Sequence, residues 1–126
     1  MIDVQAPADC GNAPKKRVLR DFTVALAERD EEAVLAAVSD DVEWDLVGRR
    51  IVHGKADFTD AVAAALGREV ATLHLDAILT HGNEGAVSSR ILFRGSGQLR
   101  CCDVYKFSGF GKTAKIKRIT SYWIEV

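Results

Sequence analysis

The sequence has few cysteines, and their positions do not suggest a disulfide framework. The three, Cys10, Cys101 and Cys102, are odd in number, and a strand would point the adjacent pair to opposite faces. Their spacing is not that of a zinc site. We therefore interpret the cysteines mainly as small apolar residues, with Cys10 in an N-terminal tail.

The chain also lacks an excess of charge, a long apolar run and the common cofactor motifs. Its 17 basic and 18 acidic residues give a net charge of −1, which predicts neither nucleic-acid nor membrane binding. No run is long enough to span a bilayer, and the first residues lack a secretory signal pattern, so we expect a cytoplasmic location. No phosphate loop, Ser-His-Asp order, metal cluster or dinucleotide fingerprint is present, so any chemistry is expected to need no cofactor.

What the sequence does contain is enough apolar material for one core. Hydrophobic residues make up 48% of the 126 positions and charged residues 28%, which is typical of one globular domain. Residues 1–12 mix Pro, Gly, Asp and Ala without periodicity and predict a loose N-terminal extension. The domain itself is expected to cover residues 13–126.

Three helices are predicted in the first half. Apolar residues recur at helical spacing from Pro14 to about residue 29, and Asp30 is a suitable N-cap for a second helix that ends before Ser39. A third helix is expected over residues 55–66, with Gly67 as its stop.

Strands are predicted after the first two helices and throughout the second half. The expected ranges are 42–46, 51–53, 70–81, 86–94, 99–107 and 114–126. Alternation over 70–81 places Leu73, Leu75 and Leu79 on one face, and the change of phase between Ile116 and Ile119 predicts a bulge. Helices grouped before a long meander indicate an α+β domain with a curved, mainly antiparallel sheet packed on its helices.

Asp103 interrupts an apolar strand face. Leu99, Cys101, Tyr105 and Phe107 alternate on this face, and Asp103 occupies its centre. Burial disfavours an ionised carboxyl and raises its pKa, so Asp103 is a candidate neutral acid that donates a hydrogen bond. The alternatives are a structural Asp paired with a basic side chain or a backbone N–H, and a bulge that turns it outward.

The order of elements resembles that of the nuclear transport factor 2-like (NTF2-like) superfamily over about residues 14–126. The residues that carry the resemblance are the helix-to-strand passage 36–45, the following Gly48, and residues 52–56 at the entry to the third helix. The superfamily includes ketosteroid isomerases, SnoaL-type polyketide cyclases and limonene epoxide hydrolases. The resemblance implies a cone-shaped mixed sheet wrapped around three helices.

The ketosteroid isomerase pattern implies two catalytic carboxyls. The stretch beginning at Asp45 is similar to the segment that carries the general base of that family, and the stretch beginning at Asp103 is similar to the segment with its protonated Asp. Asp45 is therefore a candidate base, with a solvated turn residue as the alternative. Phe22 stands where that family has an oxyanion-binding Tyr and cannot donate, so Tyr105 or Tyr122 would have to replace the donor.

The other two family patterns make different demands. The epoxide hydrolases use an Arg two residues before a strand Asp, where this chain has Cys101, and a second Asp on a later strand, where it has Thr120 and Ser121. A polyketide cyclase needs one Asp or His in an apolar cavity, and Asp103 alone would satisfy that requirement.

Three functions are therefore expected as alternatives: a small isomerase or cyclase acting on a carbonyl compound, a carrier of an apolar ligand, and an interaction module. The expected partners are a small apolar molecule and a second copy of the chain, bound through the outer sheet face. The expected pocket-lining residues are Phe22, Trp44, Phe58, Ile91, Phe93, Cys101, Tyr105 and Tyr122.

Overall fold

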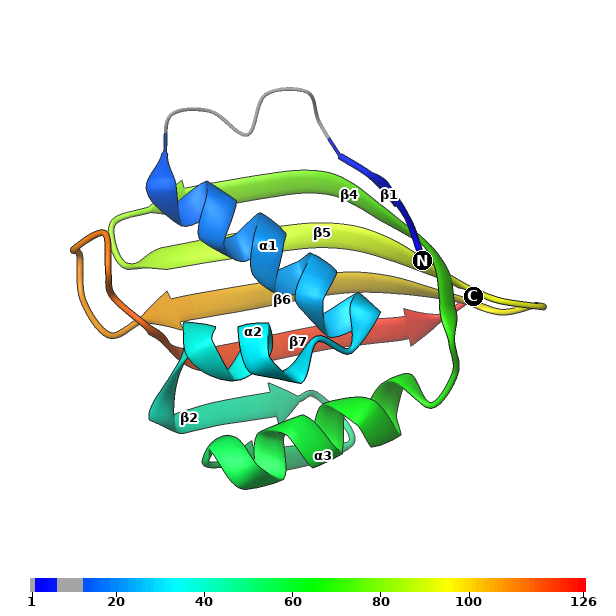
Figure 1. Cartoon of the computed structure of the whole chain (residues 1–126), viewed down its shortest axis with the longest axis horizontal. Helices are drawn as coiled ribbons and strands as arrows, with labels where there is room; N and C mark the ends of the chain where they lie inside the picture. Colours follow the sequence, from blue (N-terminus) through cyan, green and yellow to red (C-terminus); the bar gives the residue numbers. More distant parts are fainter. Residues whose placement is uncertain (1, 7–12) are drawn as a thin grey trace.

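In the computed structural model of the chain, which describes residues 2–6 and 13–126, the helices cover one face of a curved sheet (Figure 1). The described residues form three helices: α1 (Pro14–Glu28), α2 (Glu31–Ala37) and α3 (Lys55–Leu66). The predicted α+β class, with helices on one side of the sheet, is confirmed.

The sheet is mixed but mainly antiparallel. Its seven strands are β1 (Asp3–Gln5), β2 (Val38–Leu46), β3 (Arg50–His53), β4 (Val70–His81), β5 (Glu84–Phe93), β6 (Gln98–Phe107) and β7 (Ile116–Glu125). They are arranged in the order β1-β4-β5-β6-β7-β2-β3. The β1–β4 and β2–β7 pairs are parallel, and the other pairs are antiparallel. This arrangement places β6 in the middle of the sheet.

The helix ends follow the predicted local signals. Pro14 occupies the first turn of α1, where its missing N–H removes no intrahelical bond. Asp30 caps α2, because its carboxylate accepts a hydrogen bond from the backbone N–H of Ala33 at 3.2 Å. Gly67 ends α3 with φ 65°, a left-handed conformation that glycine adopts without a side-chain clash.

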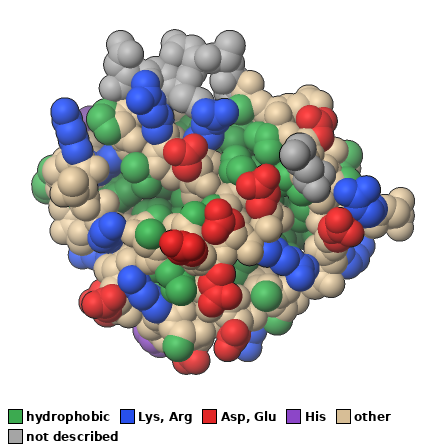
Figure 2. Space-filling model, viewed as in Figure 1, with side chains coloured by type: hydrophobic (Ala, Val, Ile, Leu, Met, Phe, Trp, Pro, Cys, Tyr) green, Lys and Arg blue, Asp and Glu red, His purple; other side chains and the backbone are tan. Residues whose placement is uncertain are grey.

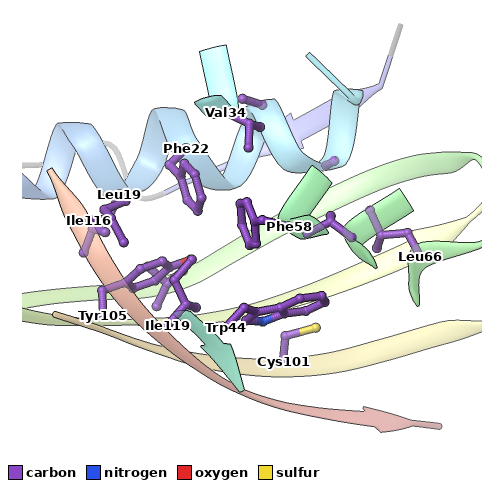
Figure 3. Packing of buried hydrophobic residues seen from close by; sticks show 14 of the residues in the cluster. Leu19, Phe22, Val34, Trp44, Phe58, Leu66, Cys101, Tyr105, Ile116 and Ile119 are labelled. Atoms are coloured by element: carbon purple, nitrogen blue, oxygen red, sulfur yellow. The ribbon is translucent and has the colours of Figure 1, made fainter. Parts of the chain in front are cut away.

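The core lies between the helices and the inner face of the sheet. On β6 the alternate residues from Leu99 to Phe107 are buried, as predicted, and their neighbours face outward. The Phe22 ring stacks on Phe58 at 6.4 Å between centroids and meets the edge of Tyr105 at 5.9 Å (Figure 3). These aromatic side chains join α1 and α3 to the sheet.

Two strand irregularities change which residues face the core. In β4 the pairing shifts between Leu75 and Ala77, so that Ile78 turns inward and Leu79 is 65% exposed. The prediction that Leu79 shares the buried face is therefore wrong. The bulge between Leu75 and Ala77 reverses the alternation of inward and outward side chains in the rest of the strand. The bulge predicted in β7 is confirmed, since Lys106 and Phe107 pair with Arg118 and Ile116 and skip one residue.

The N-terminal segment differs in part from the predicted loose extension. Residues Asp3–Gln5 form strand β1, which pairs in parallel with β4 from Thr72 to His74. A three-residue edge strand is held by hydrogen bonds to its neighbour and has no periodicity of its own to predict it. Residues 7–12, including Cys10, lie outside the described residues. Cys101 is buried and Cys102 exposed, and both are free thiols.

Candidate functional site

Asp103 lies on the inner face of β6, and its side chain is bound by two residues of the neighbouring strand. The residue is only 7% exposed. Its Oδ1 atom accepts hydrogen bonds from the Ser121 hydroxyl at 2.5 Å and from the Trp123 indole N–H at 2.9 Å. Ser121 is the direct cross-strand partner of Asp103, and Trp123 follows two residues later on the same face of β7.

Trp44 extends this network from β2. Its indole N–H donates to the Ser121 Oγ at 2.9 Å. Because an indole N–H only donates, Ser121 accepts from Trp44 and has its own proton free for Asp103. The two indole rings lie 5.6 Å apart, and they are the only tryptophans of the chain. Both indole N–H groups therefore belong to the hydrogen-bond network of Asp103, Trp123 directly and Trp44 through Ser121.

The surroundings of Asp103 favour its neutral form. Burial raises the pKa of its carboxyl to about 6, against the opposing effect of the hydrogen bonds from Ser121 and Trp123. Among the described residues no Lys, Arg or His forms an ion pair with Asp103, and no hydrogen bond ends on its Oδ2. Among the described residues Asp103 is therefore neither paired with a basic side chain nor turned outward, and its partners are two neutral side-chain donors.

A small cavity adjoins Asp103. It measures about 10 Å³, which is about the space that one water molecule needs. Of the residues expected to line a pocket, Trp44, Phe58 and Tyr105 lie at this cavity. Its full lining is Leu26, Trp44, Phe58, Val62, Asp103, Tyr105, Ile119, Ser121 and Trp123.

The other expected lining residues lie elsewhere. Phe22, Ile91, Phe93 and Cys101 are buried in the core but do not border this cavity. Tyr122 is on the outer face and 48% exposed, because alternation along β7 turns Ser121 and Trp123 inward. Tyr122 is thus not placed to replace the missing donor at Phe22.

Ser121 and Trp123 were missed as site residues, although the sequence carries a signal for both. Ile116 faces the core before the predicted bulge, and Ile119, three residues later, faces the core after it. Continuing that phase by two residues at a time points Ser121 and Trp123 to the inner face. Leu26 and Val62 follow the apolar faces of their helices, which do not reveal contact with a particular strand residue.

Asp45 is not brought together with Asp103. It lies between Trp44 and Leu46, which both face the core, so its own side chain points to the outer face of β2. Its neighbours across the sheet are Ile51 on β3 and Thr120 on β7. Asp45 and Asp103 therefore do not share the cavity.

Tyr105 lies beside Asp103 but directs its hydroxyl to α1. The Thr23 side chain, whose own hydroxyl donates to the carbonyl of Leu19 at 2.7 Å, interacts with the Tyr105 hydroxyl and acts to lower its pKa. Burial, with the nearby charge of Asp103, raises the pKa of Tyr105 well above its ordinary value. Its ring lines the cavity, while its polar end ties β6 to α1.

Two further features of the described residues bear on the site. No three His, Cys, Asp or Glu side chains of residues 2–6 and 13–126 lie close enough together to hold a metal ion. None of the described helices combines the length and the apolar character that crossing a membrane requires.

The chain is similar to known proteins in both sequence and structure. The family model for the SnoaL-like domain matches residues 19–116. No curated protein matches the chain significantly.

Solved structures of other proteins share the fold, among them the following three. A "putative ketosteroid isomerase" from Kribbella flavida DSM 17836 is 20% identical, with a TM-score of 0.74 over 90% of this chain and 79% of that one. An NTF2-like protein of unknown function from Burkholderia xenovorans LB400 is 18% identical, with a TM-score of 0.73 over 87% and 82%. Another from Cytophaga hutchinsonii ATCC 33406 is 24% identical, with a TM-score of 0.63 over 86% and 97%. At these identities the likeness shows the fold.

Proposed function

The chain belongs to the family of SnoaL-like domains, and we propose that it binds a small apolar carbonyl compound at Asp103, which acts as the acid–base group. One observation carries this proposal. Among the described residues this buried carboxyl has no cationic partner and accepts both of its hydrogen bonds on Oδ1, so its Oδ2 is free to bind a guest, and Asp103 borders a cavity. Perturbed carboxyls in apolar cavities are typical of catalytic and binding sites.

The two protonation states of Asp103 have different uses. Because Oδ1 already accepts from Ser121 and Trp123, the acid proton resides on Oδ2 and is donated to a carbonyl oxygen. The ionised form takes a proton from the carbon next to that carbonyl. With a pKa of about 6 both forms are populated near neutral pH.

A single carboxyl suits proton transfer within one substrate. The carboxylate takes a proton from carbon, and the acid so formed returns it to another atom of the same conjugated system, so no net proton is consumed. Asp45 faces outward, Phe22 carries no hydroxyl, and the Tyr105 hydroxyl interacts with Thr23 on α1. The site therefore favours cyclase-type or simple enolising chemistry. It does not offer the pair of catalytic carboxyls, one base and one acid, that the steroid isomerase pattern requires.

The test uses a small enone such as 2-cyclohexenone and follows two signals. In nitrogen–proton correlation spectra the two indole N–H signals should shift when the enone binds. In D2O the wild type should speed the exchange of the protons next to the carbonyl. Asp103→Asn keeps an acceptor for Ser121 and Trp123 and a donor for the guest, so it should retain binding and lose the exchange.

Each outcome of this test decides between functions. Binding together with Asp103-dependent exchange supports the acid–base role. Binding without exchange would select a carrier that returns its ligand unchanged. If no small enone or phenol shifts either indole N–H signal, the result would contradict a ligand site at Asp103.

A second candidate is an interaction role, with another copy of the chain on the outer sheet face. The observation in its favour is an apolar row across that face beside a nearly filled interior. Leu79, Ala86, Val104 and Thr120 are successive cross-strand partners there, and Leu79 and Val104 are exposed. Nearby exposed apolar residues of the sheet are Ile51, Tyr122 and Ile124.

Analytical ultracentrifugation tests the second candidate. Val104→Glu places a charge in the apolar row and should convert a dimer to a monomer. Ala56→Glu adds the same charge on the exposed side of α3 and should leave the dimer intact. A wild type that sediments as a monomer would exclude this self-association.

A further inference from the structure

A groove on the helical face shares two of its lining residues with the Asp103 cavity. It lies between the end of α1, α2 and α3 and measures about 70 Å³. Figure 2 shows apolar side chains in the gaps between acidic ones on this face. Arg29, Glu31 and Thr59 supply polar groups to the groove, and its apolar lining is Leu26, Val34, Val62, Ala63 and Leu66.

Leu26 and Val62 belong to both the groove and the Asp103 cavity. Leu26 is partly buried on α1, and Val62 is 7% exposed on α3. Since both side chains line the two spaces, they form the partition between them. Leu66 lines the groove but not the inner cavity, and Ile119 lines the inner cavity but not the groove.

The rest of the cavity wall is held more firmly than this partition. Trp44 is fully buried and bonded to Ser121, and Trp123 is bonded to Asp103. Phe58 is 1% exposed and packs on Phe22 and Trp44. Leu26 and Val62 are aliphatic side chains with neither a hydrogen bond nor a ring stacked on them, and Leu26 is in part accessible from outside. Leu and Val side chains move between rotamers without breaking a hydrogen bond.

We propose that the ligand of this protein reaches Asp103 through the groove, and that Leu26 and Val62 set the size of the ring it accepts. This inference rests on the proposed function. The inner cavity, with room for about one water molecule, admits a ring only if part of its wall moves. The flat indole of Trp44 and the ring of Phe58 favour a planar guest, with one oxygen directed to Oδ2.

The chemical class that fits is a flat, one- or two-ring aromatic or enone carrying a single hydroxyl or carbonyl oxygen. Its oxygen is bound at Asp103, and its apolar body lies between the two helices. A polar substituent at the far end would meet Arg29, Glu31 or Thr59 at the outer part of the groove.

Leu26→Ala and Leu66→Ala form a matched pair for testing this inference. Both remove the same atoms from the groove lining, but only the first opens the partition. The probes are phenol and the larger 2-naphthol, and the readouts are the dissociation constant and the two indole N–H signals. Leu26→Ala should bind 2-naphthol about tenfold more tightly than the wild type, because further ring carbons become buried.

The control should behave differently. Leu66→Ala should leave the affinity for 2-naphthol within about threefold of the wild type, since the inner cavity stays closed. Val62→Ala, on the other side of the partition, should repeat the effect of Leu26→Ala and provides the test if the latter variant folds poorly. Asp103→Leu added to Leu26→Ala should abolish the shift of the indole signals.

The results separate this inference from the proposed function. If phenol shifts the indole signals of the wild type but the partition variants bind 2-naphthol no better, the route is wrong and the site at Asp103 stands. Equal gains in Leu26→Ala and Leu66→Ala would also overturn the partition. If neither probe shifts the signals in any variant, both proposals fail together.

Discussion

Ser121 lies directly across from Asp103, and its hydroxyl donates to the carboxyl while it accepts from Trp44. The register of β6 and β7 makes the two residues cross-strand partners, and the hydroxyl lies 2.5 Å from Oδ1. A buried acid is thus held by neutral donors. Because no cation is paired with it among the described residues, its proton affinity is set by burial and by these donors.

Ser121→Ala should both destabilise the protein and raise the pKa of Asp103 further. The change removes a donor to Oδ1 and leaves the Trp44 indole N–H without its acceptor, at a cost of about 1–3 kcal/mol. Urea unfolding and carbon-detected titration of the carboxyl measure the two effects. Ser88→Ala, an exposed change on β5, should alter the free energy of unfolding by less than about 0.5 kcal/mol. Equal losses in the two variants would contradict a role for the network.

Asp103 should make the folded state less stable as pH rises. Its pKa is about 6 in the folded state against an ordinary 3.8, so the folded protein holds this proton more tightly than the unfolded chain does. The resulting stabilisation is complete below the ordinary pKa and is lost as pH rises through about 6, a change of about 3 kcal/mol. Asp103→Asn does not titrate, so its stability relative to wild type should grow over this range in urea melts. Parallel pH curves would show that the carboxyl does not titrate as described.

Trp123→Phe should raise the pKa of Asp103 while keeping an aromatic ring in place. The indole N–H lowers that pKa by its hydrogen bond to Oδ1, and phenylalanine has no donor. The indole signal of Trp44 should then titrate with a midpoint above that of the wild type. Tyr122→Phe, at the adjacent outward position, should leave the midpoint unchanged. A midpoint that moves equally in both variants would argue against this hydrogen bond.

The bulge in β4 predicts that truncation of Ile78 destabilises the protein and that truncation of the adjacent Leu79 does not. Ile78→Ala removes a side chain that is 8% exposed and should cost about 2–4 kcal/mol of stability. Leu79→Ala removes one that is 65% exposed and should cost less than about 0.5 kcal/mol. Chemical denaturation of both variants measures the difference. The reverse ranking would restore the uninterrupted alternation that the sequence suggests.

Much of the fold was predictable because it rests on local signals. Pro14, Asp30 and Gly67 mark helix ends through their own backbone and side-chain chemistry. The phase change before Ile119 predicted the β7 bulge, whereas the residues after the β4 bulge, Ala77, Ile78 and Leu79, are all apolar and do not show which of them faces the core. A bulge is visible in a sequence only where it changes the alternation of apolar and polar residues.

Some features of the candidate site were likewise predictable from local sequence, and others were not. The inward direction of Asp103 can be read from the sequence, because alternation between Leu99 and Phe107 is a property of one strand. The binding of its carboxyl by Ser121 and Trp123, the outward direction of Asp45 and the small size of the cavity emerge only in the folded protein. Strand register and the filling of space depend on contacts between segments far apart in the chain, and periodicity within one segment does not contain them.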